Sequence, residues 1–454
     1  MSSASKDVEG NRMARRVRRY AEVGAGVGSV AARMAGSYLL GQGGREGKHA
    51  TQLRIALEGL KGPLVKVAQM LATIPEALPE EFTTELAKLQ SNAPPMGWPF
   101  VRRRMNMELG PDWQASFTSF DRDAAAAASL GQVHRARSLG GEELACKLQY
   151  PDMESAVEAD LTQFKLILGI YRRIDGSVET DLIAEEVGAR LREELDYARE
   201  ARHMTLFRNA LAPFEKIAIP RVHQDLCTKR LLTMEWLEGA HVLSMVKAPL
   251  EVRNIIVRTI FRAWWVPFSQ YGIIHGDPHL GNYTVRPDDL GLNLLDFGCI
   301  RTFPASFVKS VIELYRALLE KDRARMAAAY ESWGFDNLSP ELIDALNIWA
   351  EFIYGPMLED RVRSVADGVR PGDYGRAQVM EVQHRLRELG PVRLPREFVF
   401  LERAAIGLGA VFLHLSAELN FYDLFQETIA DFDVARLHAR QSALLHKAGV
   451  PLPA

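Results

Sequence analysis

Three polar side chains are spaced in a way that one kind of chemistry explains. The segment HGDPHLGNY contains Asp277 and Asn282, five residues apart, and the segment LLDFGCI contains Asp296, nineteen residues after Asp277. Carboxylate and amide oxygens are hard ligands, and Mg²⁺ usually binds one or two carboxylates together with phosphates. The spacing therefore predicts phosphoryl transfer, with Asn282 and Asp296 as metal ligands and Asp277 facing an attacking hydroxyl or water. His275 is expected to be a structural histidine that bonds nearby backbone.

A cation for the phosphates is predicted upstream, in the mostly apolar stretch LACKLQY. Lys147 in this expected strand needs a partner, because an unpaired buried charge is costly, and a helix carrying EELDYAREA offers Glu200. The alanine-rich segment before the strand lies where a phosphate-covering turn would lie. Taken singly, Lys147 suits a snorkelling edge-strand lysine, Glu200 suits a solvated helix residue, and the alanine-rich segment suits a helix start. Their order along the chain favours the phosphate site.

The composition is that of an ordinary globular protein. The 454 residues are 47% hydrophobic and 25% charged, with a net charge of −3. This length allows two or three domains, and the near-neutral charge gives no attraction to nucleic acid. The three cysteines are far apart and form no Cys-x-x-Cys pair, which argues against a zinc site or disulfide framework and fits a reducing compartment.

Apolar stretches in this sequence are interrupted by charges or helix breakers before they reach the roughly 20 residues that span a bilayer. No transmembrane helix is predicted. The arginine-rich start, with Arg15, Arg16, Arg18 and Arg19, suits a disordered basic tail, which is the favoured interpretation, or a basic amphipathic helix on an anionic membrane. A cytoplasmic protein is expected, with peripheral contact at the inner membrane face through the N-terminal segment as the alternative.

Periodicity predicts a small α+β part followed by a helical part. Two strands are expected within residues 124–149, around the turn LGG at 139–141, and a buried strand at 229–237. A helical region is expected over 154–208, punctuated by Asp175–Gly176. Residues 250–450 are predicted to be mainly helical, apart from the loops and short strands around the motifs described above.

The motifs, taken in order, resemble the protein-kinase-like superfamily and, in detail, its atypical UbiB branch of AarF/ADCK-type proteins. The similar segments are AASLGQVH for an alanine-rich loop, CKLQYP for the lysine strand, ELDYAREA for the pairing helix, HGDPHLGN for the catalytic loop and KVAQ in an N-terminal extension. The resemblance covers residues 60–310 strongly. It implies a two-lobed, atypical protein-kinase-like α+β fold with an N-terminal helical extension and a largely helical C-lobe.

The resemblance also implies roles for individual residues. The catalytic set is Asp277, Lys147 and Glu200; the ATP contacts of the alanine-rich loop and the lysine strand are Ala127, Ala128, Ser129, Gly131, Gln132 and Lys147; the Mg²⁺ ligands are Asn282 and Asp296; and the regulatory set is Lys66, Gln69, Glu194 and Asp196. Independently of the resemblance, backbone groups of Glu235 and Leu237 are expected to bond the edge of adenine, because a buried strand that joins two lobes is a natural cleft position. Two positions depart from the family pattern, Ala68 for Gly and Leu280 for Pro. Glu194 and Asp196 are two residues apart, so they cannot share one face of a regular helix.

Four parts are expected on this basis. They are a basic, Gly- and Ala-rich N-terminal segment (1–45), a helical extension with the KVAQ motif (46–120), a kinase-like N-lobe with inserted helices (121–238) and a helical C-lobe with the catalytic loop and DFG (239–454).

The implied function is that of a Mg²⁺-dependent atypical kinase or ATPase supporting ubiquinone or related isoprenoid-lipid biosynthesis, with an isoprenoid lipid or quinone precursor as a candidate partner. The alternative is a pseudokinase-like module that binds lipid or scaffolds a complex without turnover. Pro304 can start a helix, which leaves only about five residues between Gly298 and that helix. A peptide-binding shelf would have little room there, and the extension is expected to fold over the site, so we expect water or a small or lipid acceptor.

Overall fold

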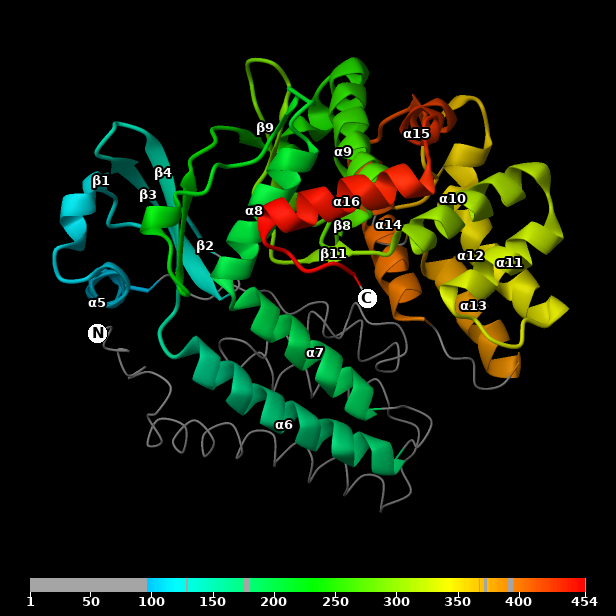
Figure 1. The fold of residues 1–454 in the computed structure, drawn as a ribbon, viewed down its shortest axis with the longest axis horizontal. Coiled ribbons are helices and arrows are strands. Elements are labelled where there is room, and N and C mark those ends of the chain that lie inside the picture. The colour runs from blue at the N-terminus through cyan, green and yellow to red at the C-terminus, as the bar shows by residue number, and fades with distance from the viewer. Residues whose placement is uncertain are drawn as a thin grey trace. The chain divides into compact units, whose positions relative to one another are not determined.

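The computed structural model describes residues 96–127, 130–174, 180–366, 368–370, 374–389 and 395–453. The chain divides into two compact units: unit 1 consists of Met1–Arg199 and His223–Trp236, and unit 2 of Glu200–Val222 and Leu237–Ala454 (Figure 1). The expected basic segment and the helical stretch that carries KVAQ lie outside the described residues.

Unit 1 is built on an antiparallel sheet with the strand order β1-β3-β4-β6, in which the short β2 also pairs with β3. The strands are β1 (Phe117–Phe120), β2 (Ala126–Ala127), β3 (Gly131–Ser138), β4 (Glu143–Gln149) and β6 (Leu231–Glu235). The predicted hairpin is confirmed as β3 and β4. The predicted buried strand is confirmed as β6, which pairs with the other side of β4. The lysine strand is therefore a central strand.

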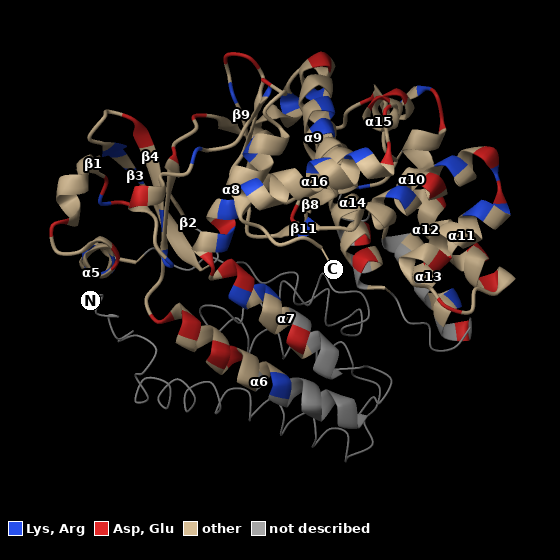
Figure 2. Cartoon of the chain, in the orientation of Figure 1, with Lys and Arg blue, Asp and Glu red and all other residues tan. Residues whose placement is uncertain are grey.

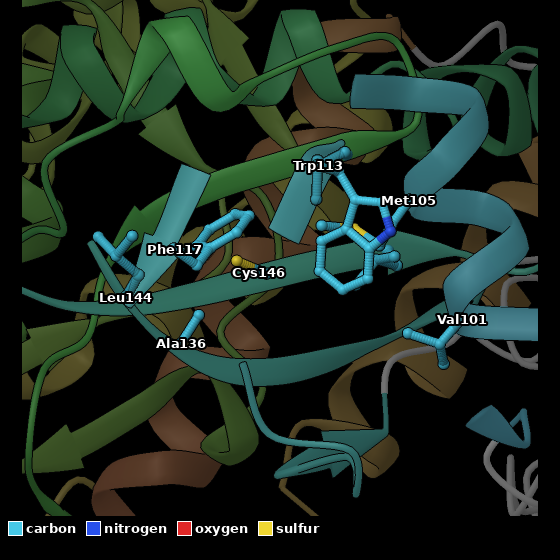
Figure 3. Packing of buried hydrophobic residues seen from close by; sticks show 9 residues of the cluster. Val101, Met105, Trp113, Phe117, Ala136, Leu144 and Cys146 are labelled. Carbon is cyan, nitrogen blue, oxygen red and sulfur yellow. The ribbon is translucent and has the colours of Figure 1, made fainter. Parts of the chain in front are cut away.

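The core of unit 1 lies on one face of this sheet. Strand alternation places Leu144, Cys146 and Leu148 together on that face. There they pack with residues of the helix α5 (Trp98–Leu109) and the 3₁₀ turn η1 (Trp113–Ser116), as Figure 3 shows. Trp113 is 2% exposed and meets Phe120 edge to face, with 5.1 Å between the ring centroids. Lys147 therefore lies on the opposite face of β4.

Three helices connect β4 with the later strands: α6 (Met153–Ile174), α7 (Thr180–Glu194) and α8 (Tyr197–Ala210). The predicted helical region is confirmed in these three helices, and Asp175–Gly176, where an interruption was expected, lie outside the described residues. The expectation of a single helix through EELDYAREA is wrong, because α7 ends at Glu194 and α8 begins at Tyr197. The Asp196 carboxylate accepts a hydrogen bond from the Arg199 amide at 2.8 Å, which is the N-cap arrangement that starts a new helix.

The described part of unit 2 contains three small sheets. They are β5-β10-β9-β7, in which β5 and β10 are parallel, and the antiparallel pairs β8-β11 and β12-β13. The bounds are β5 (Ile217–Ala218), β7 (Ala240–His241), β8 (Ile273–His275), β9 (Tyr283–Val285), β10 (Leu292–Leu294), β11 (Ile300–Thr302), β12 (Val362–Arg363) and β13 (Leu419–Asn420). These strands are short, and their main effect is to place the loops between them.

Helices make up most of unit 2, which confirms the prediction for residues 250–450. They are α9 (Leu250–Tyr271), α10 (Ala305–Glu320), α11 (Arg323–Trp333), α12 (Pro340–Leu358), α13 (Arg376–Leu389), α14 (Arg396–His414), α15 (Phe421–Ile429) and α16 (Val434–Ala448). The 3₁₀ turns are η2 (Gln224–Leu226) in unit 1, and η3 (Val242–Lys247) and η4 (Leu280–Asn282) in unit 2. Acidic and basic residues are interspersed along these helices (Figure 2).

The helix predicted after DFG is confirmed as α10, with Pro304 as its N-cap residue. The apolar stripe of this helix is buried: Val308, Val311 and Tyr315 are each 0% exposed. The fold class is α+β, as predicted. None of the helices that the structure describes is both long enough and apolar enough to cross a membrane.

The core of unit 1 yields a stability prediction. Trp113→Ala should lower the free energy of unfolding by about 3–5 kcal/mol, because it removes a buried aromatic ring and leaves a cavity. Leu139→Ala is the control: Leu139 is 72% exposed, so its loss should change stability by no more than about 0.5 kcal/mol. Urea unfolding followed by circular dichroism measures both, and equal midpoints would contradict the packing described here.

Candidate active site

Two loops of unit 2 carry the three residues with which the sequence analysis began. The loop from β8 to β9 contains Asp277 and Asn282, and the loop from β10 to β11 contains Asp296. β8 pairs with β11 and β9 pairs with β10, so each loop leaves one strand pair and enters the other. The loops therefore lie side by side, and the Leu295 amide donates to the Asn282 carbonyl at 3.0 Å.

His275 joins these two loops. Its Nε2 lies 2.6 Å from the Asp296 carbonyl oxygen, and its Nδ1 accepts the Asp277 backbone N–H at 3.3 Å. A carbonyl can only accept, so the proton must be on Nε2 and the ring is neutral. The side chain is 2% exposed. The expectation of a structural histidine is confirmed, and this one fixes Asp277 and Asp296 relative to each other.

The polar side chains of the loops are oriented by further bonds. Asn282 Nδ2 donates to the Asp277 carbonyl at 3.1 Å and to its carboxylate Oδ2 at 3.2 Å. Asp296 Oδ1 accepts the Gly298 amide at 3.0 Å. These bonds use the amide nitrogen of Asn282 and leave its oxygen as the acceptor. An amide oxygen and a carboxylate are ligands that suit Mg²⁺ bound together with phosphates. The residues present therefore fit a magnesium–nucleotide complex.

The catalytic loop is also held from outside by α14. A Cβ atom at Gly407 would lie 2.4 Å from Pro278 Cγ, closer than any real contact. Glycine is therefore needed at Gly407 for the loop to approach the helix. Beneath the loop, the buried Tyr283 hydroxyl accepts from Trp264 Nε1 at 3.0 Å, and burial raises the pKa of Tyr283.

In unit 1, Lys147 lies on the central strand β4 and is 9% exposed. The alternative of a snorkelling edge-strand lysine is therefore wrong. Its Nζ lies 5.3 Å from the ring centroid of Tyr197, within the range of a cation–π contact. The tyrosine of the ELDY segment thus lies beside the lysine ammonium group, on the side of the sheet opposite the core.

The described part of the alanine-rich segment contains the short strand β2. Ala127 ends β2, which pairs with β3, so the alternative of a helix start is wrong. Ala128 and Ser129 lie outside the described residues. A Cβ atom at Gly131 would lie 2.2 Å from the Leu148 carbonyl oxygen and 2.8 Å from the Tyr197 hydroxyl. Glycine at position 131 therefore allows the start of β3 to lie directly against the lysine strand.

The Gln132 side chain is 0% exposed and bonds inside unit 1. Its Oε1 accepts the Met96 amide at 2.6 Å, and its Nε2 lies 2.7 Å from His134 Nε2. The other ring nitrogen of His134 lies 2.8 Å from the Asp121 carbonyl, and burial lowers the pKa of His134. The Gln132 side chain therefore tethers the residue just before α5 to the hairpin, and its predicted nucleotide contact stays a prediction.

The predicted adenine-binding segment begins on β6. Alternation along this strand turns the peptide groups of Leu231, Thr233 and Glu235 away from β4. The carbonyls of Leu231 and Thr233 accept from Thr228 and His223, at 2.8 and 2.9 Å. Glu235 has the same orientation at the end of the strand, and Leu237 follows it as the first residue of this stretch in unit 2.

The remaining predicted residues flank the helix break. Glu200 is in the first turn of α8 and is 3% exposed. Glu194 ends α7, whereas Asp196 caps α8, so the two acidic residues are not on one helix. This removes the geometric difficulty raised by their spacing. Lys66 and Gln69 lie outside the described residues.

Sequence reasoning did not assign a role to the residues that anchor the end of the lysine strand. Gln149 Nε2 donates to the Leu195 carbonyl at 2.8 Å, at the helix break. Arg104 of α5 is 2% exposed and donates to the carbonyls of Gln149 and Tyr150, at 3.2 and 3.0 Å. The Gln-Tyr-Pro segment was a visible signal, but its partners are too far along the chain to be inferred.

The comparisons with known proteins agree with this arrangement. Residues 88–330, more than half of the chain, match the ABC1 atypical kinase-like domain. The chain belongs to the ABC1 atypical kinase-like family. The predicted relationship to UbiB, AarF and ADCK-type proteins is thereby confirmed, together with the atypical kinase-like fold.

Two curated relatives illustrate the similarity. AarF domain-containing protein kinase 1 of Gallus gallus is 31% identical over 301 residues, which cover 64% of this chain and 58% of the relative. Atypical kinase COQ8, mitochondrial, of Saccharomyces cerevisiae is 29% identical over 273 residues, which cover 60% of this chain and 54% of the relative. The chain thus spans little more than half the length of these relatives.

A solved structure of the Rv3197–erythromycin complex from Mycobacterium tuberculosis is similar over most of both chains. It has 25% sequence identity and a TM-score of 0.61, covering 88% of this chain and 98% of that chain.

The contact between α14 and the catalytic loop gives a prediction with opposite signs for two similar changes. Gly355→Ala in α12 meets nothing within 4 Å, so it should raise the free energy of unfolding by up to about 1 kcal/mol through helix propensity. Gly407→Ala gains the same propensity but collides with Pro278, so it should lower the free energy of unfolding by about 1–3 kcal/mol. Thermal unfolding decides this, and stabilisation by both changes would refute the contact.

Proposed function

We propose that this protein is a Mg²⁺-dependent, ATP-binding kinase or ATPase of its family, transferring a phosphoryl group to water or to a small or lipid acceptor. The observation that supports this most is the bonded pair of loops in unit 2. The Asn282 amide is bonded to the Asp277 carboxylate, and His275 ties Asp296 to the same loop. The oxygen-bearing side chains that the chemistry needs are thus oriented by the protein itself.

Each residue has one role in the proposed reaction. Asp277 orients the attacking hydroxyl or water and takes its proton. Asn282 and Asp296 would hold Mg²⁺, which when bound supplies positive charge against the phosphates. Lys147 holds the phosphates from unit 1, with Glu200 as its partner. Burial of Lys147 to 9% exposure supports this role, because the strand then presents a desolvated ammonium group.

The nucleotide is proposed to contact unit 1 at two further places. The turn from Ala127 to Gln132, including Ala128, Ser129 and Gly131, covers the phosphates with backbone. The peptide groups of Glu235 and Leu237 bond the edge of adenine. Support for the second place is the orientation of the Glu235 peptide groups away from β4.

The acceptor is proposed to be water, a small molecule or a lipid. Only Cys299–Pro304 separate DFG from α10, which leaves little room for an extended peptide. The wider role that the family resemblance implies, in ubiquinone or related isoprenoid-lipid biosynthesis, is extended to this chain on that basis. Peripheral membrane contact through the arginine-rich N-terminal segment is part of the same proposal.

A second candidate function is binding without turnover. The observation that favours it is the similar Mycobacterium tuberculosis structure, which is a complex of Rv3197 with erythromycin. A module of this kind would bind a lipid or scaffold a complex. Hydrolysis of radiolabelled ATP by the purified protein separates the two candidates, because a binding module would show none.

The regulatory part of the proposal concerns the N-terminal extension. Lys66 and Gln69 are proposed to reach the acidic residues Glu194 and Asp196 and so restrict access to the site. The break between α7 and α8 supports this, because the two acidic side chains then do not have to share one face of a regular helix.

The metal assignment predicts a specific loss. Asp296→Asn should remove the Mg²⁺-dependent part of ATP affinity, worth roughly 1.5–3 kcal/mol for a charge-assisted contact, and leave metal-free binding nearly unchanged. Calorimetric titration with and without Mg²⁺ measures this. Asp288→Asn, an exposed carboxylate on the β9–β10 turn, is the control and should bind as the unmodified protein does. Equal Mg²⁺ dependence in all three proteins would remove Asp296 from the site.

The acceptor proposal predicts slow ATP hydrolysis, raised by membranes or isoprenoid-like ligands, with little phosphorylation of generic proteins. Lys66→Ala should open the site, giving altered turnover or new autophosphorylation. Lys61→Ala, in the same segment but outside the KVAQ motif, should not. Both activities are assayed side by side. Efficient phosphorylation of a protein substrate by the unmodified chain would show the acceptor assignment to be wrong.

A further inference from the structure

Two adjacent carbonyls of the DFG segment each contact a buried histidine. The Asp296 carbonyl accepts from His275, as described above. The next carbonyl, that of Phe297, lies 3.1 Å from Nδ1 of His203. His203 is 4% exposed and belongs to α8, a different element from the catalytic loop. Because a carbonyl can only accept a hydrogen bond, Nδ1 of His203 must be protonated.

The same helix also contacts the side chain of Phe297. Phe207 is four residues after His203, and its ring centroid lies 5.5 Å from that of Phe297. Both phenylalanines are 0% exposed. Helix α8 therefore holds Phe297 at two points, the carbonyl through His203 and the ring through Phe207.

Glu200 lies on the same side of α8. Residues three or four apart on a helix are neighbours on one face, so Glu200, His203 and Phe207 form one stripe. A rotation or shift of α8 that moved Glu200 would also move the donor of the Phe297 carbonyl. The Asp296 carboxylate is only one residue away and is itself bonded to the Gly298 amide, so its orientation depends on the peptide that His203 holds.

We propose that His203 is a positioning residue that keeps the DFG segment in its metal-binding conformation and couples the position of α8 to the Asp296 carboxylate. The inference deepens the proposed function and rests on it for the role of the metal. His203 touches neither nucleotide nor metal. It acts through the peptide of Phe297, in the same way that His275 acts through the peptide of Asp296.

Three variants of the full chain test this. His203→Leu removes the donor and keeps an apolar side chain of moderate size. His203→Asn restores an N–H close to the position of Nδ1. Thr205→Val is the control on the same helix, since the Thr205 hydroxyl donates to the Ala201 carbonyl within α8 and does not bond DFG.

The first measurement needs no nucleotide. Hydrogen–deuterium exchange of the peptide covering Leu294–Ile300 should be faster in His203→Leu and close to that of the unmodified protein in His203→Asn and Thr205→Val. Unchanged exchange in His203→Leu would overturn the inference. So would faster exchange spread evenly over unit 2, which would indicate general destabilisation.

The second measurement is calorimetric titration with ADP, with and without Mg²⁺. His203→Leu should weaken Mg²⁺–ADP binding by about tenfold, the effect of one hydrogen bond, while metal-free ADP binding changes little. His203→Asn should recover most of the loss. An equal loss with and without Mg²⁺ would refute the coupling to Asp296. If the unmodified protein showed no Mg²⁺-dependent binding, the proposed function would fail together with the metal part of the inference, whereas the exchange result would still decide whether His203 positions DFG.

Discussion

A neutral imidazole joins the backbones of Asp277 and Asp296, on the two loops on which the proposed chemistry depends. His275 donates from Nε2 to one loop and accepts at Nδ1 from the other, and this needs one protonated and one unprotonated nitrogen at the same time. The ring is enclosed by aromatic side chains, with Trp264 and Phe297 both 5.7 Å away between centroids. Water therefore cannot readily replace either bond, and the separation of Asp277 from Asp296 is set by the dimensions of the ring.

In unit 1, several residues of the family-like motifs have structural roles that explain why those residue types occur. Gln132 and Gln149 use their side-chain amides to bond distant backbone, at Met96 and Leu195. Gly131 allows close packing against the lysine strand. The two glutamines lie near the same end of the β3–β4 hairpin, since the residues opposite them are Leu148 and Gly131. The start of β3 and the end of the lysine strand are therefore both anchored, the first to the residue before α5 and the second to the helix break.

Unit 2 surrounds the catalytic loop with helices rather than with an extended segment. α10 begins soon after DFG, and its apolar stripe is buried. The chain therefore enters the helical core within a few residues of DFG. On another side, α14 approaches the loop closely enough that Gly407 has no room for a side chain. α14 limits the space beside the catalytic loop, and α10 limits the length of chain that follows DFG. This is why a small or lipid acceptor suits the proposal better than a peptide.

Local patterns in the sequence were sufficient for the elements whose signals lie within a few residues. The β3–β4 hairpin, the buried strand β6 and helix α10 follow from alternation, from a turn signal and from proline at a helix start. The spacing of Asp277, Asn282 and Asp296 predicted that the three side chains act together, and the structure places them on two bonded loops. Glu194 and Asp196 could not be placed from the sequence, because an N-cap at Asp196 competes with a continuous helical pattern and the outcome depends on packing.

The tertiary structure decided how the motif residues are used. Lys147 lies on a central strand because β6 returns to pair with β4 after more than 80 residues. The amides of Gln132 and Gln149 bond partners 36 and 46 residues away, and His203 meets Phe297 across 94 residues. Hydrogen bonds of this kind form only after the chain has folded, so the sequence alone identifies the polar side chains that need partners but not which backbone groups will satisfy them.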